Sequence, residues 1–149
     1  MIRGVFKRTP GFLLFAVLAM GCGGSPQYIR SDPPLLVDAA TMISQAPLAP
    51  DENIRAVEIE RGESASTHLV RIRDRETPHV HTRYDLTVIL LQGRGTLFLA
   101  GKALPMRTGD VAFVPKETRH YFVNEGSEPA AALVSFAPAF DGPDQKPLP

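Results

Sequence analysis

Three of the four histidines in this chain lie in two short clusters whose spacing could hold a metal ion. The first cluster is His79-Val80-His81, followed by Asp85, and the second contains His120. On a β-strand, residues two positions apart point to the same face, so His79 and His81 can bind one ion together, and Asp85 shares their parity. A hairpin return would bring His120 alongside them. Imidazoles and a carboxylate with open coordination positions suit a divalent Fe, Mn, Zn or Ni ion, and the residues do not choose among these.

The second cluster resembles a motif of the cupin family, which reads glycine, five residues, Pro-x-Gly, two residues, histidine, three residues, asparagine. Here Gly109, Pro115, His120 and Asn124 keep all of these spacings, and Glu117 stands where glycine is usual. The resemblance extends over roughly residues 52 to 140. It implies an all-β fold, the cupin-type double-stranded β-helix or jelly-roll barrel, with the metal inside. It also implies a homodimer, since single-domain cupins often pair through their sheet edges.

The first motif of that family leaves two registers open. It reads HxH, three or four residues, Glu, six residues, Gly. With Asp85 in the Glu position, seven residues precede Gly93, whereas a strict count puts Leu86 there and removes the carboxylate ligand. Strand parity favours Asp85 on the histidine face and Leu86 on the other, and a β-bulge before Gly93 would absorb the extra residue.

The fourth histidine, His68, is the candidate catalytic residue. It alternates with Val70 and Ile72, so we expect it to point into the barrel. There it could contact substrate, support a metal ligand or transfer a proton. The alternative is a buried, hydrogen-bonded histidine without chemistry.

The chain begins with features of an export signal. Residues 1–21 contain three basic residues and then a short apolar stretch over 11–20, too short to span a bilayer, and Cys22 follows as the only cysteine. This resembles a bacterial lipoprotein signal with Cys22 as the lipidation site, although Ala19 stands where leucine is usual. An ordinary secretory signal with an incidental cysteine is the alternative.

Lipidation would place the protein at the cell envelope, anchored to a membrane without spanning it. By resemblance to Gram-negative lipoproteins, Gly23 after the cysteine predicts outer-membrane retention on the periplasmic side. The formal net charge is zero, and no basic patch is interleaved with aromatic residues. Nucleic acid is therefore not an expected partner.

After the signal, three regions follow. The Pro-, Gly- and Ser-rich residues 22–50 predict a flexible tether, within which 35–43 could form a short helix or strand. Residues 51–140 read as short strands separated by turns and predict the cupin domain. Residues 141–149 are expected to form an irregular tail.

Two functions of different classes are compatible with these residues. The first is a metal-binding enzyme of the dioxygenase, isomerase or lyase type acting on a small oxygen-rich molecule. The second is a non-catalytic module that binds a metal or a small molecule. A weaker third hypothesis is a degenerate cupin without metal, which the Leu86 register would support.

Overall fold

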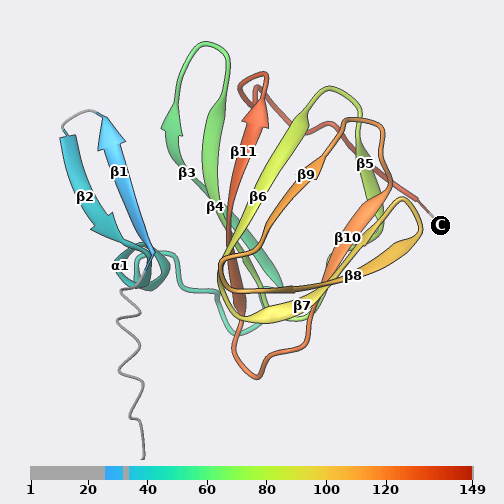
Figure 1. The fold of residues 1–149 in the computed structure, drawn as a ribbon, viewed down its shortest axis with the longest axis horizontal. Coiled ribbons are helices and arrows are strands. Elements are labelled where there is room, and N and C mark those ends of the chain that lie inside the picture. Colours follow the sequence, from blue (N-terminus) through green and yellow to red (C-terminus); the bar gives the residue numbers. More distant parts are fainter. Residues whose placement is uncertain (1–25, 32–33, 149) are drawn as a thin grey trace, which may run out of the picture.

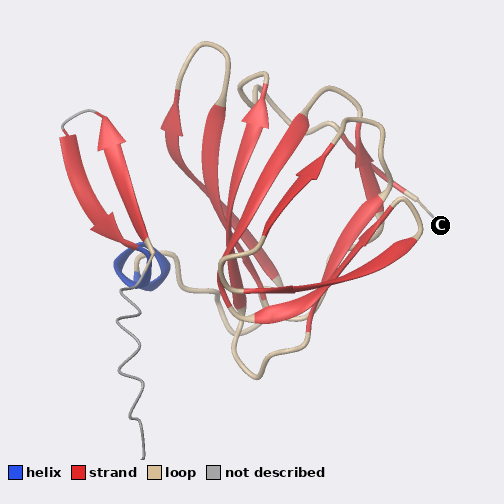
Figure 2. Ribbon diagram, in the orientation of Figure 1, coloured by secondary structure: helices blue, strands red, loops and turns tan. Residues whose placement is uncertain are grey.

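The computed structural model describes residues 26–31 and 34–148, which form two facing antiparallel sheets with a hairpin and one helix beside them (Figures 1 and 2). One sheet has the strand order β12-β5-β10-β7-β8 and the other β3-β4-β11-β6-β9. The elements are β1 (Gln27–Ser31), β2 (Pro34–Asp38), α1 (Ala39–Ser44), β3 (Ile54–Arg61), β4 (Ser66–Ile72), β5 (His79–His81), β6 (Asp85–Gln92), β7 (Arg94–Leu99), β8 (Lys102–Arg107), β9 (Val111–Val114), β10 (His120–Asn124), β11 (Ala130–Ala137) and β12 (Gln145–Pro147). The predicted all-β jelly-roll class is confirmed.

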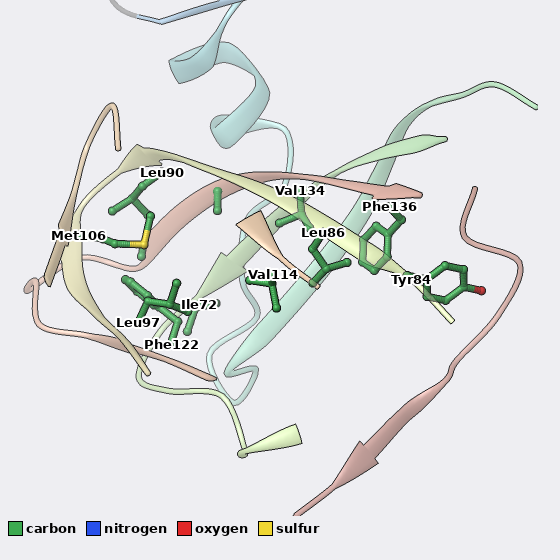
Figure 3. Close-up of a cluster of buried hydrophobic side chains, with 12 residues drawn as sticks. Ile72, Tyr84, Leu86, Leu90, Leu97, Met106, Val114, Phe122, Val134 and Phe136 are labelled. Carbon is green, nitrogen blue, oxygen red and sulfur yellow. The ribbon is translucent and has the colours of Figure 1, made fainter. Parts of the chain in front are cut away.

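The inner faces of the two sheets follow the alternation of the sequence. In β4, His68, Val70 and Ile72 face the space between the sheets, while Leu69 between them is fully buried on the outer face. Figure 3 shows the inner apolar side chains running from Leu90 and Met106 at one end of the barrel toward Phe136 at the other. Because the inner faces of the strands form the core, the hydrophobic pattern also helps to determine the strand register.

The expected bulge before Gly93 is present in β6. Ala131 of β11 pairs with Gln92 and the next residue, Ala132, pairs with Leu90, so one extra residue is inserted in β6. Strand β6 belongs to the second sheet and does not continue β5. This change of sheet decides where Asp85 points.

The prediction of a flexible tether over 22–50 does not hold for the part of it that the structure describes. Strands β1 and β2 form a hairpin, and α1 packs through Ala39 and Met42 against Leu69 and Ala131 on the outer face of the second sheet. Asp38 caps the helix by accepting from the backbone N–H of Thr41 at 2.9 Å. Proline and glycine content alone did not reveal this second, smaller core.

The predicted irregular tail over 141–149 is also ordered where it is described. Residues 145–147 form β12, which pairs with β5, and the N–H of Leu148 donates to the carbonyl of Pro78 at 2.8 Å. The barrel therefore includes the C-terminal segment, which lies beside β5 near the end marked C in Figure 1.

The predicted signal peptide and Cys22 lie outside the described residues. Within residues 26–31 and 34–148, no helix has the length and apolarity needed to cross a membrane.

Candidate metal centre

Three histidines meet inside the barrel. His79 and His81 lie on the same face of β5, and the strand pairing places His120 of β10 directly opposite His79. All three side chains are buried, and one ring nitrogen from each lies within 4.8 Å of the others. The expected grouping of these histidines is therefore present, and all three can reach one ion.

The Nδ1 atom of each ring makes a hydrogen bond within the protein. His79 Nδ1 donates to the carbonyl of Thr77 at 2.7 Å, and His120 Nδ1 donates to the carbonyl of Thr118 at 2.8 Å. His81 Nδ1 lies 2.7 Å from Oδ1 of Asp144. A histidine that donates from Nδ1 presents the lone pair of Nε2, which is the form that binds a metal.

Burial keeps two of the imidazoles uncharged at neutral pH. Burial lowers the pKa of His120 to about 4, assisted by the neighbouring rings of His79 and His81. Burial also lowers the pKa of His81, although Asp144 opposes the change. Since a metal ligand must be unprotonated, the cluster is ready to bind a cation without first losing protons.

The structure does not bring Asp85 into this cluster. Its Oδ1 accepts a hydrogen bond from the backbone N–H of Lys116 at 2.8 Å, whereas Leu86 faces the cavity with the histidines. The parity argument that put Leu86 on the opposite face was wrong, because it counted along one strand. The chain leaves the first sheet after His81 and enters the second at β6, so the alternation restarts.

The cluster opens into a cavity of about 1050 Å³ in the barrel interior. Most of its wall is apolar. Its ionisable or amide side chains include Glu58, Arg61, His68, Glu76, Asp141 and Gln145. A cavity of this size holds a small molecule.

Glu76 is a site residue that the sequence did not indicate. Its Oε2 accepts from the backbone N–H of Phe122 at 2.8 Å, and its carboxyl group lines the cavity. Burial raises the pKa of Glu76, while the nearby His79 partly opposes the shift. Because Glu76 precedes β5 in a loop, no strand alternation marked it.

The C-terminal segment supplies two more residues that the sequence analysis missed. The side chain of Asp144, only 2% exposed, contacts His81 as described above. Gln145 Nε2 lies 3.2 Å from Nε2 of His79. These contacts follow from the pairing of β12 with β5, which no residue pattern in residues 141–149 predicts.

His68 points into the barrel, as its alternation predicts. Its Nε2 lies 3.0 Å from Oγ of Ser66 and 3.9 Å from a carboxylate oxygen of Glu58. Burial lowers its pKa. The rings of His68 and His81 both contact Phe136 edge-on, with centroid distances of 5.0 and 5.6 Å, so one aromatic ring separates His68 from the cluster.

The sequence matches a protein-family pattern and a related protein. The sequence pattern of a family described as a cupin domain matches residues 57–136. A protein of Aquifex aeolicus (strain VF5), described as uncharacterized, is 38% identical over 93 residues, which cover 62% of this chain and 76% of that protein.

Several solved structures have a similar fold. Pac13 of Streptomyces, determined with uridine, has a TM-score of 0.57 and 22% identity, over 71% of this chain and 87% of that one. KdgF from Halomonas sp. has a TM-score of 0.58 and 23% identity, over 66% of this chain and 91% of that one. At these identities the likeness concerns the fold alone.

Proposed function

This chain belongs to the cupin family, and we propose that it is a metal-dependent enzyme acting on a small, oxygen-rich molecule. His79, His81 and His120 would hold a divalent Fe, Mn, Zn or Ni ion through their Nε2 atoms. One observation carries the proposal: three buried imidazoles, each with its Nδ1 already bonded, converge on a cavity of about 1050 Å³.

The bound ion would supply Lewis-acid assistance to a substrate oxygen, or dioxygen chemistry if the metal is redox-active. The protein's own residues bind and orient the substrate and handle protons. Glu76 is suited to proton transfer because burial raises its pKa, and His68, across Phe136 from the cluster, is the second candidate. The apolar wall excludes water from the ion and accepts the less polar part of the substrate.

Similar barrels support lyase-type chemistry as the first reaction to test. Pac13 is described as a nucleoside dehydratase and was solved with uridine. A polar, hydroxyl-bearing molecule of that size is compatible with the cavity volume of this protein. Isomerase and dioxygenase reactions are the alternatives, and the identity of the bound metal decides which of them to test next.

The protein would act at the bacterial cell envelope. The basic and apolar residues before Cys22 support a lipid anchor on that cysteine, and Gly23 supports retention at the outer membrane, facing the periplasm. Metabolic labelling with a radioactive fatty acid tests this. Label should enter the native protein and be absent from a Cys22→Ala variant, and equal labelling of the two would contradict the anchor.

A homodimer is part of the proposal. Strand β9 is the last strand of its sheet, and it exposes Val111 by 63% and Phe113 by 58%. Apolar side chains on a sheet edge favour pairing with a second copy. Size-exclusion chromatography with light scattering should give twice the monomer mass, and Phe113→Lys should reduce it to the monomer.

Metal content is the decisive measurement for the proposed function. The native chain and a His79→Ala, His81→Ala double variant are expressed without added metal and examined by elemental mass spectrometry. Near-stoichiometric metal in the native chain and its loss in the double variant are expected. No metal in the native chain, even after reconstitution, would contradict the proposal.

A second candidate function is a non-catalytic module that captures a metal or a small molecule. The predominantly apolar wall of the cavity favours it, because such a wall binds without taking part in chemistry. Tight ligand binding by the metal-loaded protein with no turnover of hydroxylated substrates would support this second function over the first.

A further inference from the structure

The C-terminal strand β12 lies directly beside the strand that carries two of the three histidines. Its register pairs Gln145 with His81 and Pro147 with His79. The strand lies beyond residue 136, the last residue matched by the family pattern. This pairing brings the last described residues of the protein next to the proposed metal site.

Asp144, just before β12, fixes the orientation of one imidazole. One carboxylate oxygen lies 2.7 Å from Nδ1 of His81, and the other accepts from the backbone N–H of Arg83 at 2.8 Å. Burial favours the neutral form of Asp144, but these hydrogen bonds outweigh it and lower its pKa. His81 is thus held by a carboxylate, whereas the other two histidines are held by backbone carbonyls.

Gln145 reaches the metal-facing side of the cluster. Its amide nitrogen lies 3.2 Å from Nε2 of His79, which is the atom that would bind the ion, and its side chain lines the cavity. A half-turn of the amide plane brings Oε1 to the same place, since the two ends of an amide have nearly the same shape. Amide oxygen is a suitable ligand for divalent cations.

The carboxylate of the first histidine motif and the nearby Glu76 are less well placed to be the fourth ligand. Asp85 binds the backbone of Lys116, and Leu86, which faces the cavity, has no donor atom. Glu76 accepts from Phe122 and does not belong to the group of converging ligand atoms.

The geometry points to β12 and Asp144 as a structural part of the metal centre, in which Asp144 positions His81 and Gln145 supplies the fourth protein ligand. The inference rests on the proposed function, because it requires that the three histidines bind a metal. In this inference the C-terminal segment supplies the fourth ligand, which the first histidine motif does not supply here.

The test is Co²⁺ binding by the native full chain and by four single variants, one of which, Gln145→Glu, is the rescue. Gln145→Leu removes the amide, Asp144→Asn keeps the shape of the carboxylate without its charge, and Lys146→Ala is the control. Lys146 is exposed and is the middle residue of the same three-residue strand, so by alternation it points away from the face of Gln145. Affinity is measured by competition with a chelator, and coordination by the visible absorption of bound Co²⁺.

We expect Gln145→Leu and Asp144→Asn each to weaken Co²⁺ binding by about tenfold or more, with Lys146→Ala unchanged. The absorption spectrum should change in Gln145→Leu, since a ligand is lost, and Gln145→Glu should restore tight binding through its carboxylate oxygen.

Two results would overturn the inference, and they can be told apart. If the native chain binds Co²⁺ and both variants match Lys146→Ala in affinity and spectrum, the C-terminal residues are not part of the centre, while the proposed function stands. If the native chain binds no Co²⁺, the proposed function fails and the inference fails with it.

Discussion

At the scale of single residues, the surroundings of His120 disfavour a positive charge. It is 5% exposed, its Nδ1 donates to Thr118, and two other imidazoles lie beside it. A proton on Nε2 would point toward two rings of the same kind, so burial and the neighbouring rings act together. The same surroundings that lower its pKa also prepare it to bind a cation.

This environment predicts that the metal-free protein loses stability in mild acid. The pKa of His120 is about 4 in the folded state and about 6.5 in the unfolded state, so below pH 6.5 the unfolded chain takes the proton first. The contribution of His120 to the free energy of unfolding is therefore fully present above about pH 6.5. It is lost as the pH falls toward 4. Between about pH 7.5 and pH 5, His120 accounts for a loss of about 2 kcal/mol.

Urea denaturation in the presence of a chelator measures this loss. His120→Gln, which has no group titrating in this range, should show a dependence on pH that is smaller by about 2 kcal/mol over the same interval. Equal pH dependence in the two proteins would show that His120 is not the group responsible.

Glu117 occupies a backbone conformation that glycine adopts more easily. Its φ is +60°, in the left-handed region, and its N–H donates to the carbonyl of His81 at 2.6 Å. Glu117→Gly should raise the free energy of unfolding by roughly 0.5 kcal/mol, because relief of strain exceeds the added entropy of the unfolded chain. Lys116→Gly, at a neighbouring residue with negative φ, should instead lower it. Destabilisation by both changes in thermal denaturation would refute the strain argument.

At the scale of elements, the pairing of β10 with β5 and β7 positions the metal site. His120 lies opposite His79 on one side and Leu99 on the other, so β10 is held along both edges. The position of His120 therefore depends on how closely β7 can approach β10. Gly95 of β7, which pairs with Asn124, sets that approach.

Gly95→Ala is expected to disrupt this pairing. An added Cβ would lie 2.1 Å from the carbonyl oxygen of Val123 and 2.4 Å from the ring of Phe122, distances that require the backbone to shift. The loss of stability should be about 3 kcal/mol. Metal affinity should also fall, since β10 carries His120.

Gly101→Ala is the matched control for this change. It meets no atom within 4 Å, and only its φ of +80° is unfavourable, so it should cost about 1 kcal/mol and leave metal binding intact. Equal losses in the two variants, measured by urea denaturation, would show that close packing at Gly95 is unimportant.

At the scale of the whole molecule, the structure joins a second core to the barrel. Arg71 of β4 is buried and donates from Nη1 to the carbonyl of Ile43 at 2.9 Å and to that of Ala46 at 3.3 Å. These bonds tie the end of α1 to the outer face of the second sheet. Since β4 also carries His68 on its inner face, the two cores share a strand.

Met42→Ala tests whether the helix is an integral part of the fold. Met42 is 6% exposed in the second core, so its truncation should lower the free energy of unfolding by about 2 kcal/mol. Gln45→Ala, at an exposed residue of the same segment, should change it by less than about 0.5 kcal/mol. A negligible effect of both in urea denaturation would mean that the helix docks too weakly to stabilise the barrel.

Much of the barrel was predictable from the sequence because strand alternation is a local property. Residues 51–140 form short strands separated by turns, as predicted, and the inward face of β4 agrees with the pattern of His68 and its neighbours. The histidine pair on β5 and the motif that contains His120 were likewise readable, since each depends only on spacing within one strand or one turn.

The tertiary structure alone decided which other groups reach the metal site. Parity placed Asp85 with the histidines, but the chain changes sheets between β5 and β6, and parity has no meaning across such a break. Glu76 comes from a loop, and Asp144 and Gln145 come from a segment more than 60 residues beyond the histidines they contact. The sequence by itself thus determined the strands and the three imidazoles. Long-range pairing, which leaves no periodic trace in a short tail or loop, determined how those imidazoles are oriented and what surrounds them.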